Sequence, residues 1–272
     1  MVKAINAWAF PDTLTMRDKL LAAKRAGFSA FEPTLQESGE YSLDSSLDEF
    51  AALKSFAAEQ EMELTSLATG LYWKYGYTDP EAVDKACEIT RFQLKAAQAL
   101  GVKTILVVPG NITEEASKEP YDALYDRALS AVKSLIPLAQ KTGVAIGIEN
   151  VWNKFLLTPL EMRNFIDAAG SPYVKCYLDV GNMLLFGYPE QWIATLGERV
   201  ACVHVKDFKR SVGTMGGFCC LLEGDVNFPA VISALNEVNY TGPLIAEVSP
   251  INGGADMAAD MASLALNKII GD

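Results

Sequence analysis

Three observations predict that this sequence folds as one α/β domain in which eight parallel strands close into a barrel. Short apolar runs alternate with long amphipathic stretches along the whole chain, and there are eight of each. Such alternation is typical of a parallel sheet whose strands are joined by helices. The length of 272 residues suits a single (β/α)8 barrel, or TIM barrel. Half of the residues are apolar, which suffices for one large core.

The apolar runs define the expected strands, and the stretches between them define the expected helices. Several helices begin with a proline, as at Pro159 and Pro189, where a missing backbone N–H costs least. Several end at a glycine, as at Gly101 and Gly143, which suits a left-handed cap before the next strand. The expected strands are residues 4–10, 30–35, 64–69, 104–109, 144–151, 175–180, 200–206 and 244–248. The expected helices are residues 16–26, 47–60, 80–100, 123–142, 159–169, 189–196, 229–238 and 257–270.

A doubly wound open sheet is the alternative architecture for the same alternation. It is disfavoured because no GxGxxG or GxxxxGK[ST] loop follows any expected strand. No linker or low-complexity tract divides the sequence, so we expect residues 1–272 to form a single domain. The longest irregular stretches, residues 70–79 and 210–225, both follow strand ends. Both should therefore overhang the catalytic mouth of the barrel.

Charge and cysteine content narrow the classes of function. The net charge of −11 argues against a nucleic-acid partner, because neutralising phosphates requires clustered lysine and arginine. The same acidity, and the lack of a run of about 18 apolar residues, argue against a membrane partner. No signal segment opens the sequence, and the five cysteines form no CxxC pair. We therefore expect reduced thiols and a cytoplasmic protein.

Polar residues end the last four expected strands. In a TIM barrel the active site lies at the carboxyl ends of the strands, so these positions are the first candidates for chemistry. They are 30, 25 and 43 residues apart, and each separation spans about one strand–helix unit. We therefore expect their side chains to come from neighbouring strands and to point at a common centre. The four residues are Glu149, Asp179, His204 and Glu247.

Three carboxylates that converge on an apolar barrel mouth repel one another unless a positive charge compensates them. A divalent cation does so most simply, and carboxylate oxygens with one imidazole suit Mn²⁺, Mg²⁺ or Co²⁺ better than a thiolate-rich zinc site does. Ordinary salt bridges are the alternative for the carboxylates, and a structural role is the alternative for His204, the only histidine. The carboxylates that end the strands on either side of His204 favour ligation. The sequence does not identify the partner of its second ring nitrogen.

Four segments carry a resemblance that covers nearly the whole chain. They are Gly147-Ile-Glu-Asn150, Leu178-Asp-Val-Gly-Asn182, Val203-His-Val-Lys-Asp-Phe-Lys-Arg210 and Ala246-Glu247. With them the chain resembles the xylose-isomerase-like barrel superfamily, and within it the ketose 3-epimerases and the ulose-5-phosphate 3-epimerases. The resemblance implies one divalent metal, usually Mn²⁺, bound by Glu149, Asp179, His204 and Glu247. It also implies that Arg210 contacts the substrate.

One position departs from the pattern of those epimerases. They commonly carry a substrate-binding histidine three residues after the metal-binding aspartate, and this sequence has Asn182 there. Asparagine can donate a hydrogen bond to a sugar hydroxyl but cannot carry charge, so the departure bears on the substrate rather than on the metal. The same superfamily includes endonuclease IV, whose three zinc ions need many histidines. One histidine cannot supply that cluster, which excludes the nuclease function.

The reaction implied by the resemblance moves a proton at a carbon next to a carbonyl group. A metal that chelates the substrate would stabilise the metal-bound enediolate. Glu149 and Glu247 would flank the sugar, one removing the proton and the other returning it. Return to the same carbon gives an epimer, and return to the adjacent carbon gives aldose–ketose isomerisation. Two alternatives stay open, namely an inosose-type dehydratase, which is a lyase, and a non-catalytic sugar-binding barrel.

A cationic loop after the seventh expected strand bears on whether the substrate is a sugar or a sugar phosphate. Lys209, Arg210 and Ser211 lie there, near the place where barrels often hold phosphate. A mobile lid with a solvated basic end is the alternative interpretation of this loop. A homo-oligomer is compatible with the fold, although the sequence indicates no interface.

Polar and aromatic residues near other strand ends are further candidates for substrate contacts. Trp8, like Trp73 and Trp152, can stack on a sugar face or belong to the core. Glu32, toward the end of the second expected strand, and Asn6, within the first, are candidates for contacts with sugar hydroxyls.

Overall fold

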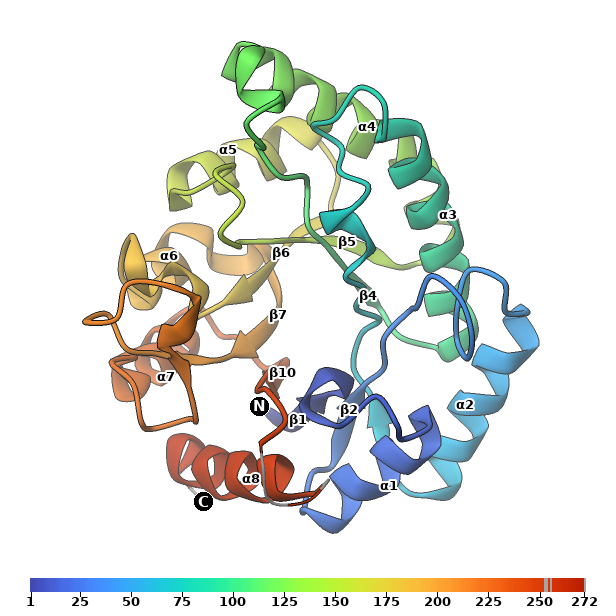
Figure 1. The fold of residues 1–272 in the computed structure, drawn as a ribbon, viewed down its shortest axis with the longest axis vertical. Coiled ribbons are helices and arrows are strands. Elements are labelled where there is room, and N and C mark those ends of the chain that lie inside the picture. Colours follow the sequence, from blue (N-terminus) through green and yellow to red (C-terminus); the bar gives the residue numbers. More distant parts are fainter. Residues whose placement is uncertain (252–253, 255, 272) are drawn as a thin grey trace.

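Eight parallel strands close into the barrel that the sequence predicts (Figure 1). The computed structural model describes residues 1–251, 254 and 256–271. Around the barrel the strands lie in the order β3-β2-β1-β10-β7-β6-β5-β4, so the last strand pairs with the first. Their bounds are β1 (Val2–Asn6), β2 (Ala30–Glu32), β3 (Glu63–Leu64), β4 (Thr104–Val107), β5 (Ala145–Glu149), β6 (Val174–Asp179), β7 (Val200–Val205) and β10 (Pro243–Ala246).

A ring of helices surrounds the strands (Figure 1). Thr15 and Ser46 cap the first two helices, each accepting a hydrogen bond from a backbone N–H of the first turn. Gly101 and Gly143 end the third and fourth helices in the left-handed region, at φ +79° and +68°, as predicted. Within the described residues, none of the helices has the length and apolar character needed to cross a membrane. The helices are α1 (Met16–Arg25), α2 (Leu47–Glu59), α3 (Val83–Leu100), α4 (Tyr121–Thr142), α5 (Pro159–Ala169), α6 (Pro189–Leu196), α7 (Phe228–Glu237) and α8 (Met257–Ile270).

The barrel closes at a thin seam between β3 and β4. Leu67 and Ile105 form an isolated parallel bridge there, and the N–H of Leu106 donates to the carbonyl oxygen of Leu67 at 3.0 Å. Gln93 of α3 is fully buried, and its amide donates to the carbonyl oxygens of Leu67 at 2.8 Å and Leu106 at 3.2 Å. A helix side chain therefore fastens the seam where the strand ladder is short.

The observed strands end before the expected ones at the barrel mouth, and the difference is largest for two of them. The expected strand 4–10 ends at Asn6, because the side chain of Asn6 accepts the N–H of Trp8 at 2.6 Å and begins a short 3-10 helix. The expected strand 64–69 is regular only in β3, since the seam offers few ladder partners.

An antiparallel pair that the sequence did not predict lies in the long loop after β7. It consists of β8 (Asp207–Phe208) and β9 (Phe218–Cys219). The N–H of Lys209 also donates to the carbonyl oxygen of Gly217 at 2.8 Å, which extends the pairing. Part of the stretch expected to be irregular is therefore an ordered hairpin.

Candidate active site at the mouth of the barrel

The four predicted metal ligands meet at the carboxyl ends of neighbouring strands. Glu149 ends β5, Asp179 ends β6, His204 lies on β7, and Glu247 directly follows β10. These strands are consecutive in the barrel, and Asp179 lies opposite His204 in the register of β6 and β7. Each residue offers one ligand atom, and the four atoms lie within 4.8 Å of one another. The fold therefore brings together side chains that are far apart in the sequence.

His204 is fully buried between carboxylates on two sides. Its Nδ1 is 2.6 Å from Oε2 of Glu247 and 3.3 Å from Oε1 of Glu149, whereas its Nε2 is 2.7 Å from Oε2 of Glu32. Burial by itself lowers the pKa of His204, but the charges of Glu32 and Glu247 outweigh burial and raise the pKa well above its ordinary value. The bond to Glu32 fixes the ring so that Nδ1 faces the other predicted ligands.

Glu32 is thus the partner of His204 that the sequence left unidentified. Its Oε1 accepts hydrogen bonds from the hydroxyl groups of Ser66, at 2.6 Å, and Tyr177, and its Oε2 accepts one from the side-chain amide of Asn6. Burial raises the pKa of Glu32, but His204 and these hydroxyl donors outweigh burial and lower the pKa below its ordinary value. Asn6 and Glu32, both predicted as sugar contacts, are fully buried and support His204 from within the barrel.

Backbone groups orient the carboxylate of Asp179. Its Oδ1 accepts the N–H groups of Gly181 at 2.8 Å and Asn182 at 2.7 Å. The side chain of Asn150 also bonds both the N–H and the carbonyl oxygen of Asp179, each at 2.8 Å. Burial raises the pKa of Asp179, and the charge of Lys206 partly offsets that rise. These contacts leave Oδ2 of Asp179 directed toward the other ligands.

Lys206 belongs to the same cluster, although no role was predicted for it from the sequence. Its Nζ is 2.8 Å from Oε1 of Glu247 and 3.4 Å from Oδ2 of Asp179. Burial raises the pKa of Glu247, but Lys206 and His204 outweigh burial and lower the pKa to about 2. At Glu149 burial dominates and raises the pKa to about 7. The alternation of side chains along a strand could have indicated that Lys206 belongs to the site, because a residue two positions after His204 points to the same face of the sheet.

This donor set fits a divalent cation. Oδ2 of Asp179 and Oε2 of Glu247 are buried and have no hydrogen-bond partner within the described residues, although Nζ of Lys206 lies 3.4 Å from Oδ2 and Nδ1 of His204 lies 2.6 Å from Oε2. Such oxygens are costly to bury unless a cation binds them. Three carboxylates and one imidazole match the ligands of Mn²⁺, Mg²⁺ or Co²⁺. Glu149, Asp179, His204 and Glu247 are therefore a candidate metal centre.

A cavity of about 960 Å³ opens onto Glu149 and Glu247. Its volume is ample for a monosaccharide. The predicted substrate contacts Trp8, Asn182 and Lys209 line this cavity. Apolar groups make up much of the remaining wall, which includes Trp73, Leu106, Val108, Val151, Trp152, Phe218, Val248 and Ile251.

The two cations of the predicted basic loop are placed differently. Lys209 lines the cavity, where its Nζ is 2.5 Å from Oε1 of Glu223. Arg210 is not among the described residues that line the cavity, and half of its side chain is exposed. Its backbone N–H donates to Oδ2 of Asp225 at 2.8 Å, and its Nε is 3.9 Å from the same oxygen. The structure therefore brings Lys209, but not Arg210, to the cavity wall.

Asn182 contributes to the wall through two hydrogen bonds. Its side-chain amide donates to the backbone carbonyl oxygen of Asn150 at 3.0 Å. Its backbone carbonyl oxygen accepts the indole N–H of Trp152 at 2.6 Å. The ring of Trp152 packs against Phe208 and Phe218, with centroids 5.2 Å and 5.3 Å away. At the position that departs from the epimerase pattern, the backbone therefore holds Trp152 in place and the side chain bonds the backbone of Asn150.

Together the fold and the site define a class of protein, a (β/α)8 barrel with a carboxylate–histidine centre at the mouth of a sugar-sized cavity. The xylose isomerase-like TIM barrel family matches residues 20–265, and the chain belongs to this family. The family and the fold predicted from the sequence are confirmed.

Similar proteins include several that are named as epimerases. An Escherichia coli (strain K12) protein named "Putative L-ribulose-5-phosphate 3-epimerase SgbU" is 24% identical over 248 residues, which cover 88% of this chain and 86% of that protein. The L-ribulose 3-epimerase of Methylomonas sp. (strain DH-1) is 27% identical over 244 residues, or 85% of this chain and 77% of that protein. The crystal structure of a D-tagatose 3-epimerase-like protein has a TM-score of 0.84 at 20% identity and covers 100% of this chain and 97% of its own. The names of the first two relatives support an enzyme of the isomerase and epimerase class.

Proposed function

We propose that this protein is a divalent-metal-dependent sugar or sugar-phosphate isomerase or epimerase. The observation that carries the proposal is the convergence of four ligand atoms within 4.8 Å at the base of a sugar-sized cavity. Two of those ligands, Glu149 and Glu247, also line the cavity and so can reach a bound sugar. The names of the relatives, L-ribulose 3-epimerase among them, support a ketose as substrate.

Glu149, Asp179, His204 and Glu247 would hold one divalent ion, with Mn²⁺ as the proposed native metal and Mg²⁺ or Co²⁺ as substitutes. When bound, such an ion stabilises negative charge that develops on the oxygen atoms of a substrate carbonyl and neighbouring hydroxyl. Asp179 would bind the metal and have no role in proton transfer, because backbone groups fix its carboxylate and it is not among the described residues that line the cavity. The cytoplasmic location and the oligomeric state stay predictions.

Glu149 and Glu247 would carry the proton. They come from β5 and from the end of β10, with β6 and β7 between them, and so approach a sugar from different sides of the barrel mouth. One carboxylate would remove the proton next to the carbonyl, and the other would return a proton to the opposite face. Trp8 and Trp152 would pack against the sugar and exclude water, and Asn182 would position the ring of Trp152.

Hydrogen–deuterium exchange tests this proposal. The purified protein, reconstituted with Mn²⁺, should exchange the proton next to the carbonyl of a ketopentose or ketohexose in D₂O and release the stereoisomer, both followed by NMR. Glu149→Gln and Glu247→Gln should each slow exchange by about 100-fold or more. Glu237→Gln, on the exposed face of α7, removes the same charge far from the site and should not change the rate.

The other outcomes identify the rival functions. Release of water and a dehydrated ketone would identify a lyase. A sugar that stabilises the protein against heat but never exchanges its proton would identify a binding protein. The proposal fails if no ketose or ketose phosphate exchanges and the protein retains no divalent metal on dialysis.

A further inference from the structure

We infer that the substrate is an uncharged sugar, a free ketose rather than its phosphate ester. This inference rests on the proposed function, which leaves both substrate classes open. It follows from the charges of two loops at the barrel mouth. TIM barrels often hold a phosphate in the loops after the seventh and eighth strands. In this chain those loops follow β7 and β10.

The sequence of these loops is poor in cations. Residues 211–267 contain neither lysine nor arginine, although they hold most of the loop after β7 and the whole loop after β10. A phosphate dianion in a protein is normally held by arginine or lysine together with backbone N–H groups. The cations that these two loops do contain are Lys206, Lys209 and Arg210, which directly follow β7.

Each of these three cations faces a carboxylate of the protein. Lys206 lies 2.8 Å from Glu247, Lys209 lies 2.5 Å from Glu223, and Arg210 contacts Asp225. Among the described residues of the cavity wall, two cations stand against four carboxylates. The cations are Lys206 and Lys209, and the carboxylates are Glu149, Asp207, Glu223 and Glu247. A divalent metal would add two positive charges, but at the ligand end of the cavity rather than at its outer wall. Apart from the ligands Glu149 and Glu247 and their neighbour Lys206, the wall holds Lys209 against Asp207 and Glu223. A phosphate on the far end of a sugar would therefore meet one paired lysine and an excess of negative charge.

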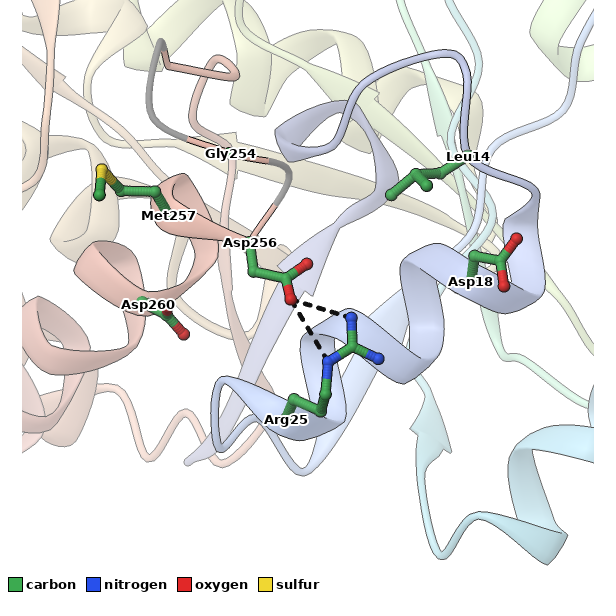
Figure 2. Close-up of a pocket in the computed structure, with 7 residues that line it drawn as sticks. All are labelled: Leu14, Asp18, Arg25, Gly254, Asp256, Met257 and Asp260. Atoms are coloured by element: carbon green, nitrogen blue, oxygen red, sulfur yellow. Dashed lines mark hydrogen bonds and ion pairs between the residues drawn. The ribbon is translucent and has the colours of Figure 1, made fainter.

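The first turn of α8, which follows the loop after β10, is acidic. A second cavity of about 490 Å³ lies there, between α1 and α8 (Figure 2). Its one arginine, Arg25, directs Nη2 and Nε at Oδ2 of Asp256, at 2.9 and 3.3 Å. Figure 2 shows that Asp18 on α1 and Asp260 on α8 also border this cavity. The helix start that could hold a phosphate group is therefore surrounded by carboxylates, which repel it.

The wall of the main cavity suits an uncharged polyol. Trp8, Trp73, Trp152 and Phe218 offer aromatic faces on which the C–H groups of a sugar can pack. The carboxylates of the wall can accept hydrogen bonds from the hydroxyl groups of a sugar, but they repel a phosphate ester, which carries a charge of about −1.5 to −2 at neutral pH. Both features favour a ligand that carries hydroxyl groups and no anion.

A matched pair of ligands tests the inference. The Mn²⁺-loaded enzyme is given a ketopentose, a ketohexose and the terminal phosphate ester of each, and kcat/KM for proton exchange is measured together with the equilibrium Kd from quenching of tryptophan fluorescence. The free sugar should exceed its ester by about tenfold or more in both quantities. A higher kcat/KM or tighter binding for the esters overturns the inference and leaves the proposed function intact. Binding of free sugars without exchange supports the inference and removes the proposed function. Failure to bind any of the four ligands removes both.

A charge variant provides an independent measurement. Glu223→Gln frees Lys209 at the cavity wall, so the preference for the free sugar should fall by about threefold to tenfold through tighter binding of the ester. Glu237→Gln is the matched control, because it removes the same charge from a helix outside the cavity. An unchanged preference in Glu223→Gln would mean that charge does not set the selectivity, and the inference would be wrong.

Discussion

Replacing Glu32 with Gln tests whether the buried network positions the metal-binding histidine. The substitution keeps the size of the side chain and removes its charge. The amide oxygen can still accept from Asn6 and His204, while the amide nitrogen can donate to the hydroxyl oxygens of Ser66 and Tyr177, since hydroxyl groups accept as well as donate. The hydrogen-bond pattern can therefore survive, and what changes is the charge opposite Nε2 of His204.

The expected magnitude follows from this one contact. The bond of 2.7 Å between Nε2 and Oε2 of Glu32 is fully buried and has an ionised acceptor. Hydrogen bonds to charged groups contribute about 1.5–3 kcal/mol and neutral ones about 0.5–1.5 kcal/mol, so the change costs about 1–2 kcal/mol of metal binding. The Kd for Mn²⁺ should therefore rise roughly 5- to 30-fold, near the lower part of the roughly 10- to 100-fold range for partners of metal-binding histidines.

Isothermal titration calorimetry of the two proteins with Mn²⁺ gives the two Kd values directly. Circular dichroism verifies that Glu32→Gln is folded. Glu63→Gln is the control, because Glu63 is exposed at the start of β3 and its loss changes the net charge equally. If Glu32→Gln binds Mn²⁺ within threefold of the original protein, or if Glu63→Gln weakens binding as much, then Glu32 does not act through His204.

Three further outcomes concern stability. Gln93→Leu should lower the Tm by about 2–8 °C, because the carbonyl oxygens of Leu67 and Leu106 lose a hydrogen-bond donor worth about 1–2 kcal/mol. Thermal unfolding followed by circular dichroism measures the Tm, and an unchanged value would contradict the role of Gln93. Removal of metal by a chelator should lower the Tm by about 5–10 °C relative to protein in Mn²⁺ at about 100 times its Kd, because binding at that concentration adds about 2.7 kcal/mol to the free energy of unfolding. Equal Tm values with and without metal would argue against a metal site. Lys206→Met should lower the free energy of unfolding of the chelator-treated protein by about 1–3 kcal/mol, because Asp179 and Glu247 lose their lysine partner. Urea titrations measure the loss, and adding metal should restore part of it. A loss of the same size with and without metal would contradict the conclusion that Lys206 and the metal compensate the same carboxylates.

Most of the fold could be predicted because hydrophobic periodicity reports burial directly. Strands such as β5 and β6 are buried on both faces and appear in the sequence as continuous apolar runs, so their ends are well defined. The seam was not predictable in the same way. Residues 64–69 are apolar enough for a strand, but whether they pair regularly depends on how the two edges of the barrel meet. Gln93, which fastens that seam from a helix, has no signature in the sequence of its own segment.

The candidate ligands could be predicted because each one lies at or next to the carboxyl end of a strand, and the topology alone brings such ends together. The support of those ligands depends on rotamers and on packing across the barrel, and neither follows from spacing. Asn6 and Glu32 were therefore identified as candidate site residues and given a contact with sugar, whereas their side chains turn inward to His204. Lys206 was missed although it lies two residues after His204, because spacing alone does not place its ammonium group between two carboxylates.

The two halves of the barrel divide the work of the site. All four candidate ligands come from the second half, from β5 to β10, whereas Asn6, Glu32 and Ser66 come from the first three strands and their ends. His204 connects the halves, because its two ring nitrogens face carboxylates from both. Substitutions inside the first half should therefore alter metal affinity without removing a ligand. The geometry of the centre therefore depends on closure of the barrel. Glu32 lies on β2 and His204 on β7, and these strands are connected through β1 and β10 on one side and through the β3–β4 seam on the other.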